Sequence, residues 1–264
     1  MKKLYYYLVM MKAYMRIGII TFTEYPLDSI IWCVAMFARE AASFFGIFFI
    51  CKMLGGLGAW TLYEICILFG MAMIPEAIGQ CFFDSVWNIG TFIRDGTLDK
   101  FIVRPLPIIM QLLGNRYTFQ AVITIISGGI IIYYGIYHAM VSFTIGNFLL
   151  LILFIICGTS INTSIYLIFN SLNFWIIQGN DIAYLVLTIR QFAKYPITIF
   201  PKVVEVTISY VIPFAFVSYY PTLYLIGKGT VFIPICTVFI AILLPLIAIG
   251  IWNCGMKKYD STGT

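Results

Sequence analysis

Long apolar segments separated by short polar ones run through most of the chain. Four of them are clear, and they cover about residues 27–51, 61–86, 145–169 and 231–252. A helix needs about 20 apolar residues to cross the hydrocarbon core of a bilayer. Each run is long enough, so the pattern predicts transmembrane helices rather than the half-buried elements of a soluble domain.

Two further spans are less regular. The third begins at Ile108 or at Arg116 and runs to Tyr137, and the fifth covers 174–192. The fifth is weakened by polar side chains, namely Asn180, Asp181 and Arg190. With these two, we predict an all-α polytopic membrane protein with six transmembrane helices.

The segment 195–227, before the last span, is rich in proline. Pro196, Pro201, Pro213 and Pro221 fall within 26 residues. Proline removes a backbone donor and breaks the helical hydrogen-bond ladder, which disfavours one straight span here. We therefore predict two short re-entrant helices that dip into the outer leaflet.

The first 25 residues have an amphipathic pattern. Apolar residues recur at helical spacing, while Lys12 and Arg16 lie on a different stripe. The two basic residues interrupt the apolar stretch and no small-residue cleavage site follows, which argues against a cleavable signal. The pattern favours a helix lying in the cytoplasmic interface. The alternative is an extension of the first span. The apolar stripe comprises Leu4, Leu8, Met11, Met15 and Ile19.

Composition agrees with a single transmembrane domain over residues 1–264. The chain is 62% hydrophobic and 10% charged, with a mean hydropathy of +0.98, whereas soluble domains are about 25% charged. The seven cysteines lie in apolar runs without a CxxC pair, so we interpret them as buried thiols. The net charge of +5 without a long basic run favours lipid headgroups over nucleic acid as a partner.

The distribution of basic residues predicts the orientation, because lysine and arginine are enriched on the cytoplasmic side. With both termini inside, the external side carries only Lys52, Lys194, Lys202 and Lys228. The cytoplasmic side carries Lys2, Lys3, Lys12, Arg16, Arg94, Lys100, Arg104, Lys257 and Lys258. We therefore expect both termini to be cytoplasmic, with a short external turn at 138–143.

The most charged stretch is the cytoplasmic loop 88–107. Asp95-Gly96 is a turn dipeptide, Thr97 can cap a short helix, and Pro105 would stop it. We predict a docking helix whose apolar anchors are Leu98, Phe101 and Ile102; the alternative is a plain basic loop. The candidate coupling residues are Arg94, Asp95, Gly96, Thr97, Leu98, Asp99, Lys100, Phe101 and Arg104.

Residues 93–106, with the sequence IRDGTLDKFIVRPL, resemble the signature of type-2 ABC transporter permeases. The likeness is to a subgroup with the pattern R-x-G-x-L-D-x-x-[LI]-x-R-P-L. Residues 195–201 and 212–221 resemble the Y-P-x-x-I-[FY]-P and I-P-F-A-F-V-x-Y-Y-P segments of that subgroup. With the six-span order, the resemblance covers essentially the whole chain.

The resemblance implies a half-transporter in a bacterial-type inner membrane. A second permease, identical or related, would complete the membrane unit, and two separate ABC ATPase subunits would bind the cytoplasmic loops. ATP and Mg would then be bound by those partners, with no cofactor on this chain. Members of the family mostly export lipids, polysaccharides, peptides or drugs. The loop after the second span would carry the coupling helix.

The residues agree that this chain has no nucleotide or catalytic site. A phosphate-binding loop needs the pattern G-x-x-x-x-G-K-[ST]. The nearest candidate is Gly227-Lys228-Gly229-Thr230, which lacks the first glycine and has glycine after the lysine. One histidine in the chain excludes an HExxH-type metal site. We expect no enzyme activity and no metal.

Charged residues within the spans are candidates for a translocation path. Arg39, near the middle of its span, would cost about 2.5–3.5 kcal/mol to insert, so it should face protein or water. Neighbouring side chains diverge by about 100° around a helix, so we expect Glu40 not to neutralise it. Glu64, Glu76 or Asp84 would be better partners. Two interpretations of these charged residues remain open: they line the translocation path, or they form a structural ion pair between spans.

The fourth span carries a face of small and polar residues. Packing against a neighbouring helix is the more common use of such a face, and contact with cargo is the alternative. The face comprises Gly158, Ser160, Asn162, Thr163 and Ser164.

Two other functional classes compete with the ABC permease. A proton-coupled secondary transporter would use Glu40, Glu76 or Asp181 as proton carriers, but we find no inverted repeat of the kind common in such folds. A membrane enzyme would need a nucleophile and a base, and His138 at a turn does not supply them.

Overall fold

A computed structural model describes residues 2–141, 144–176 and 178–259. This part of the chain is helical throughout its regular structure, and Leu57 and Trp60 form an isolated β-bridge. Parts of several predicted segments lie outside the described residues, namely position 1 of the amino-terminal helix, positions 142–143 of the external turn, position 177 of the fifth span and positions 260–264.

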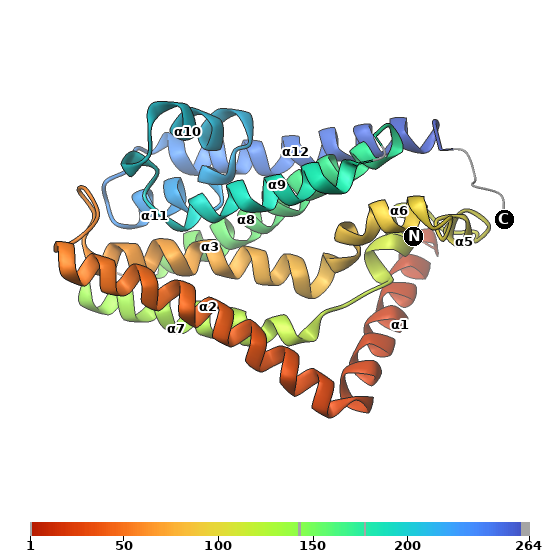
Figure 1. Ribbon diagram of the computed structural model, residues 1–264, viewed down its shortest axis with the longest axis horizontal. Helices are drawn as coiled ribbons and strands as arrows, with labels where there is room; N and C mark the ends of the chain where they lie inside the picture. The colour runs from red at the N-terminus through yellow and green to blue at the C-terminus, as the bar shows by residue number, and fades with distance from the viewer. Residues whose placement is uncertain (1, 142–143, 177, 260–264) are drawn as a thin grey trace.

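Five long helices run side by side along the molecule (Figure 1). They are α2 (Pro26–Leu54), α3 (Leu62–Phe83), α7 (Val122–His138), α8 (Ile145–Ser171) and α12 (Phe232–Met256). With short extensions, these five are long and apolar enough to cross a membrane. The central helix is α3, which packs on α7 and α8, while α12 packs on the other side of α8. The clear apolar runs therefore correspond to the long helices.

Local sequence explains the connection between α2 and α3. Gly55 ends α2 with a φ of 76°, a left-handed conformation that glycine adopts without strain. Thr61 and Glu64 then form a capping box, in which the Thr61 hydroxyl accepts from the Glu64 backbone and the Glu64 carboxylate from the Thr61 backbone. Lys228 Nζ lies 2.8 Å from Glu64 Oε1 and joins the segment after α11 (Tyr219–Leu225) to this end.

Glycines allow α3 and α7 to pack closely. A Cβ built on Gly135 would lie 2.7 Å from the carbonyl oxygen of Tyr63, and one on Gly70 would lie 2.8 Å from that of Gly128. Small residues at such contacts let membrane helices approach backbone to backbone. We call Gly70, Gly128 and Gly135 the glycine contact.

The amino-terminal helix α1 (Lys2–Glu24) runs across one end of the bundle at a steep angle to α2 (Figure 1). Its partly buried side includes Tyr14, Gly18 and Phe22, whereas Met15 and Ile19 of the predicted apolar stripe are exposed. A helix covers these residues as the pattern predicted, but the side that contacts the bundle is not the predicted apolar stripe, because the small Gly18 lets Tyr117 and Phe119 approach.

The third span is divided by a break at 115–118. Helix α6 (Ile108–Gly114) precedes the break, and η2 (Phe119–Ala121) and α7 follow it. The candidate span is Phe119–His138, which begins three residues after Arg116, whereas Ile108 begins the separate short helix α6.

The fifth predicted span is shorter than expected. The short helix η3 (Leu172–Phe174) ends a continuation of α8, and the chain returns along α8 as α9 (Gly179–Gln191) and η4 (Phe192–Lys194) (Figure 1). The 13 residues of α9 extend about 20 Å, less than the ~30 Å hydrocarbon core. The predicted span began too early, at Phe174 of η3, whereas α9 begins at Gly179.

The proline-rich segment forms short helices. Lys202–Val211 and Phe214–Leu225 meet at an angle of 72°, as a broken span or a re-entrant loop. Three of the four prolines immediately precede a short helix, and Pro221 lies within α11. The short helices are η5 (Ile197–Ile199), α10 (Lys202–Val206), η6 (Thr207–Val211), η7 (Phe214–Phe216) and α11.

Between α3 and α6 the chain forms η1 (Asp84–Asn88), α4 (Ile89–Arg94) and α5 (Asp99–Ile102). The helix α5, the start of α1 and the end of α12 lie at one end of the molecule (Figure 1). The connection between α2 and α3 lies at the opposite end, with α10.

Candidate functional site

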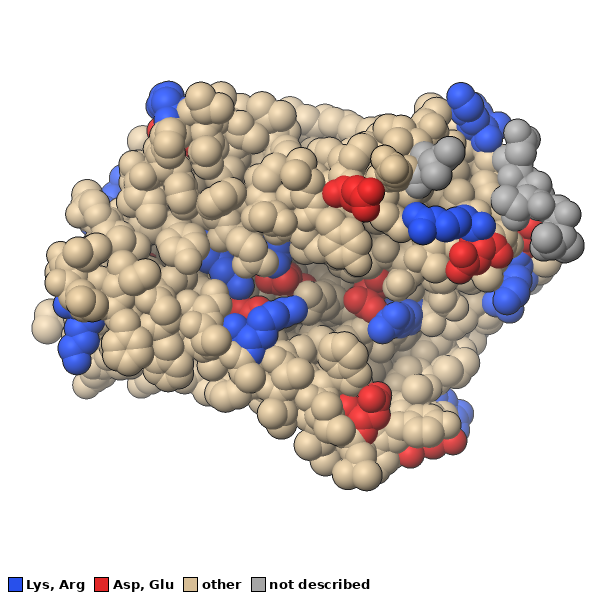
Figure 2. All heavy atoms as spheres, viewed as in Figure 1, with Lys and Arg blue, Asp and Glu red and all other residues tan. Residues whose placement is uncertain are grey.

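A cleft lined by charged side chains opens between α2, α3 and α9. Figure 2 shows basic and acidic residues gathered in a hollow on a face that is otherwise mostly uncharged. The cavity measures about 650 Å³. It is lined by Arg39, Glu40, Ser43, Glu76, Gln80, Asp84, Trp87, Tyr184, Leu187, Thr188, Arg190, Gln191 and Lys194. We call it the charged cleft.

Glu40 of α2 binds two cations. Its Oε2 lies 2.8 Å from Lys194 Nζ, and its Oε1 lies 2.9 Å from Arg39 Nη2. The side chains of Glu40 and Lys194 are only 4% and 5% exposed, whereas that of Arg39 is 55% exposed. Glu40 and Lys194 are therefore a buried pair, and Arg39 covers it from the open side.

A second buried pair joins α3 to α9. Glu76 Oε1 and Arg190 Nη2 form a close ion pair, and Gln80 Nε2 lies 3.3 Å from the same carboxylate oxygen. Among the described residues, Glu76 Oε2, Arg190 Nε and the Tyr166 hydroxyl have no hydrogen-bond partner. Buried polar groups are normally hydrogen-bonded, so Glu76 and Arg190 give the charged cleft polar atoms that are free to bind a further group.

Helical spacing explains how the pairs form. Arg190 and Lys194 are four residues apart, as are Glu76 and Gln80, so each couple lies on one side of its helix. Just after α3, Asp84 Oδ2 lies 2.9 Å from Arg116 Nε, so the carboxylate of Asp84 in the cleft wall is already paired.

The structure brings together three of the four predicted path residues. Arg39, Glu40 and Glu76 line the charged cleft, whereas Asn162 is buried in α8 beside Gly79 and is not among its lining residues. Our expectation that Glu40 could not neutralise Arg39 was wrong. The backbone directions of neighbours diverge, but both side chains are long enough to meet.

Sequence reasoning missed Arg190 and Lys194. Lys194 was placed on the external side with other lysines, yet it is buried, and Arg190 was interpreted only as a weakness of the fifth span. Their spacing of four residues within an apolar segment was the available signal, because such charges need a partner inside the bundle.

The small polar face of α8 takes part in helix packing and also lines a cavity. Ser160 Oγ donates to the carbonyl oxygen of Ala241 in α12 at 2.8 Å, and a Cβ on Gly158 would lie 3.0 Å from Pro75. Thr163 and Ser164, with Ser160, also line an apolar cavity of about 410 Å³ between α3, α6, α8 and α12.

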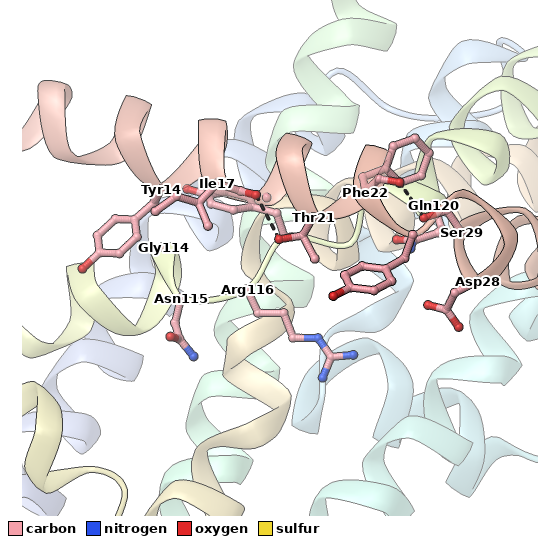
Figure 3. Close-up of a pocket in the computed structure, with 13 residues that line it drawn as sticks. Tyr14, Ile17, Thr21, Phe22, Asp28, Ser29, Gly114, Asn115, Arg116 and Gln120 are labelled. Atoms are coloured by element: carbon pink, nitrogen blue, oxygen red, sulfur yellow. Dashed lines mark hydrogen bonds between the residues drawn. The ribbon is translucent and has the colours of Figure 1, made fainter.

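A smaller cavity of about 200 Å³ lies between α1, the start of α2 and the break after α6 (Figure 3). The side chains of Asn115 and Arg116 extend from the break on the side away from α1. Ser29 Oγ donates to the carbonyl oxygen of Phe22 at 2.8 Å. This bond fixes the sharp turn between α1 and α2.

Two apolar side chains of the charged loop 88–107 are buried. Leu98 is fully buried and Phe101 is 6% exposed within the core of the chain. Gln111 Nε2 donates to the carbonyl oxygens of Phe101 and Leu106 at 2.8 and 2.9 Å. The expectation that Leu98 and Phe101 are docking anchors is therefore corrected, because both are used to hold the loop against α6.

The predicted helix in this loop is one turn long. Leu98, not Thr97, occupies the N-cap position of α5, and the Thr97 hydroxyl donates to the carbonyl of Phe92 instead. Ile102 and Val103 are 45% and 82% exposed. They stand among the charged residues of the loop that are also exposed, Arg94, Asp95, Lys100 and Arg104.

The segment after α12 contacts this loop. The ring of Tyr259 lies 6.2 Å from that of Phe174. Burial, together with the neighbouring carboxylate of Asp99, raises the pKa of Tyr259 to about 12. Asp99, one of the candidate coupling residues, therefore faces the carboxyl-terminal segment.

The part of the chain that the structure describes contains no group of three or more histidine, cysteine or acidic residues that could hold a metal ion. The acidic groups of the charged cleft are instead paired with lysine and arginine. The cleft can offer a polar group a cationic and hydrogen-bonding surface.

Comparison with known proteins identifies the family. No curated protein sequence is significantly similar to the chain. A family model described as ABC-2 family transporter protein matches residues 37–263, from the middle of α2 to the segment after α12. The match includes the charged cleft, the loop with α5 and the proline-rich helices. The chain therefore belongs to the ABC-2 family of transporter membrane proteins.

Proposed function

We propose that the chain is the permease subunit of an ABC exporter, which forms a translocation path with a second permease and is driven by separate ATPase subunits. The observation that carries this proposal is the charged cleft, placed at mid-length on an apolar helical face of an ABC-2 family chain. Charged groups at that depth are costly beside lipid, so a polar path or a partner explains them better.

The distribution of charge supports an orientation with the end that carries α5 in the cytoplasm. Arg94, Lys100 and Arg104 are exposed there, and α1 with Lys12 and Arg16 crosses the same end. Basic residues favour the cytoplasmic side. Five helices are long and apolar enough to cross the membrane, and the bent proline-rich pair would be a sixth span only if it crosses as one. The proposed six crossings therefore need α9 together with the short helices η3 and η4 that flank it, with the proline-rich helices as a re-entrant pair on the outside.

The loop with α5 is the proposed ATPase contact. Its exposed apolar residues, Ile102 and Val103, stand between Lys100 and Arg104. Apolar anchors with a charged rim are typical of a helix that binds in a groove. Of the anchors that the sequence suggested, Ile102 is exposed whereas Leu98 and Phe101 are buried, so Val103 takes their place at the same position of the chain.

A proton-coupled transporter receives less support from the geometry. Glu40 and Glu76 are each engaged by buried cations, and Asp181 is exposed at the start of α9. To carry a proton, Glu40 or Glu76 would have to give up its ion pair with a buried cation, and the exposed Asp181 is not enclosed by the bundle.

Purification of the chain with and without its proposed partner tests the function. We expect a separate ATPase to copurify and to hydrolyse ATP, and the chain alone to show no hydrolysis. ATP hydrolysis by the isolated chain would contradict the proposal, as would ATP-independent transport that follows a proton gradient.

A further inference from the structure

We propose that the charged cleft binds the anionic headgroup of an amphiphilic cargo, and that Arg39 is the residue that contacts it. The inference rests on the proposed transport function and specifies the chemistry of the cargo. It follows from the charge balance of the cleft, from the exposure of Arg39 and from the mixed character of the walls.

The charge balance leaves one cation in excess. Arg39, Arg190 and Lys194 face Glu40 and Glu76, and the third carboxylate of the wall, Asp84, is already paired with Arg116. Lys194 and Arg190 are buried against Glu40 and Glu76 respectively. Arg39 is the cation whose charge these pairs do not require.

Arg39 is also the cation that a ligand can reach. Its side chain is 55% exposed, whereas those of Lys194 and Arg190 are 5% and 6% exposed. It bonds Glu40 through Nε and Nη2, at 3.1 and 2.9 Å. A guanidinium group has five N–H donors and suits the planar, bidentate recognition of phosphate or carboxylate, so donors remain for an incoming anion.

The position of the charged cleft along α2 favours an amphiphile over a soluble anion as the ligand. Arg39 lies near the middle of the 29 residues of α2, among apolar residues that are exposed along the same helix. The wall itself includes Trp87, Tyr184 and Leu187 beside the charged groups. A headgroup at Arg39 would thus leave an attached chain against apolar surface.

Further hydrogen-bonding groups line the charged cleft. Ser43, Gln80 and Gln191 line the cleft, and Arg190 Nε is an unpaired donor among the described residues. At 650 Å³ the cavity lies within the about 300–1,000 Å³ typical of ligand sites.

The test compares three probes on the purified full chain in detergent micelles. The first is a single-chain phosphatidic acid, the second a single-chain phosphatidylcholine with the same acyl chain, and the third is glycerol 3-phosphate. Equilibrium binding of each is measured on the wild type, Arg39→Gln and Arg39→Lys. Lys52→Gln is the matched control, because it removes an exposed charge from the far end of α2.

We expect the phosphatidic acid to bind about tenfold more tightly than the phosphatidylcholine, as one charge-assisted contact would give. Arg39→Gln should abolish this preference, Arg39→Lys should keep most of it, and Lys52→Gln should leave it unchanged. Glycerol 3-phosphate should compete weakly because it lacks the acyl chain.

Three results would overturn the inference: no preference in the wild type, a preference that survives Arg39→Gln, or glycerol 3-phosphate binding as tightly as the lipid. The measurement needs no ATPase. A chain that captures an ATPase but lacks the preference would therefore refute only the cargo chemistry. A chain that captures none would refute the proposed transport function.

Discussion

At the scale of single residues, two buried ion pairs connect α9 and the following short helix η4 to the rest of the bundle. Glu40 with Lys194 joins α2, and Glu76 with Arg190 joins α3. Because α9 is short and α2 makes few contacts with α3, these pairs supply much of the specific attachment at the charged cleft.

Removing one member of the Glu76–Arg190 pair should destabilise the chain strongly. Glu76→Gln leaves the Arg190 charge buried without a partner, and we expect it to lower the free energy of unfolding by about 3–5 kcal/mol. The double variant Glu76→Gln with Arg190→Met should recover much of the loss. Thermal denaturation in detergent measures the effect.

The matched control is the ion pair between Lys202 and Glu205, in which the Lys202 side chain is 78% exposed. Lys202→Gln should not change the denaturation midpoint measurably, because exposed pairs are screened by solvent. A similar midpoint for Glu76→Gln and the wild type would mean that the pair contributes nothing to stability.

The sequence identified the charged residues of α2 and α3 as important but not how they pair. Pairing depends on helix rotation and on which helix is the neighbour, and a single sequence does not contain either. Lys194 shows this most clearly, because the same lysine is compatible with an external loop and with a buried ion pair.

At the scale of elements, two contacts fix how neighbouring segments pack outside the charged cleft. The glycine contact brings α7 against α3, and the inward residues of the α5 loop hold it on α6. Neither depends on charge, so both can be tested by changes of side-chain volume alone.

Gly135→Ala should weaken the packing of α7 on α3. The new methyl group would lie 2.7 Å from the carbonyl oxygen of Tyr63, too close for an unshifted backbone. We expect a loss of about 1–3 kcal/mol, as for other overpacked sites. Gly129→Ala on the same helix is the control, since nothing lies within 4 Å of its added Cβ. Equal stability of the two variants would show that the close approach is not needed.

Phe101→Ala should destabilise the chain rather than only its contact with an ATPase. Phe101 is 6% exposed and packs on Phe92 with ring centroids 5.7 Å apart. Truncating a buried phenylalanine costs about 3–5 kcal/mol. The neighbouring Ile102→Ala, at a residue that is 45% exposed, should leave the denaturation midpoint nearly unchanged. A stable Phe101→Ala would mean that the loop does not pack as described.

The apolar runs predicted the long helices well, because length and hydropathy alone determine a membrane span. The short elements could not be predicted equally well. Helix α9 is limited by polar residues at its start, and the direction of Leu98 and Phe101 depends on α6, which lies close in space rather than in the local pattern.

At the scale of the whole molecule, the two ends differ. One end carries α1, α5 and the end of α12, with the exposed basic residues of the loop, and the other carries the proline-rich helices (Figure 1). The charged cleft lies between them (Figure 2). In the proposed transporter, the ATPase binds at the end that carries α5, and the cargo is released at the opposite end.

Site-specific cross-linking tests the central claim most directly, that the α5 loop is where an ATPase binds. Cys51, Cys66, Cys81 and Cys157 are buried, as we expected of all seven cysteines. The expectation was wrong for Cys236 and Cys254, which are exposed, and for Cys33, which is only partly buried. Replacing the exposed pair with serine gives a suitable background.

A single new cysteine is then placed at Val103, which is 82% exposed beside α5, or at Met140, which is 91% exposed after α7 at the other end. With a cross-linker and the copurified ATPase, we predict capture from Val103→Cys and none from Met140→Cys. Capture from Met140→Cys and none from Val103→Cys would invert the topology and contradict the account.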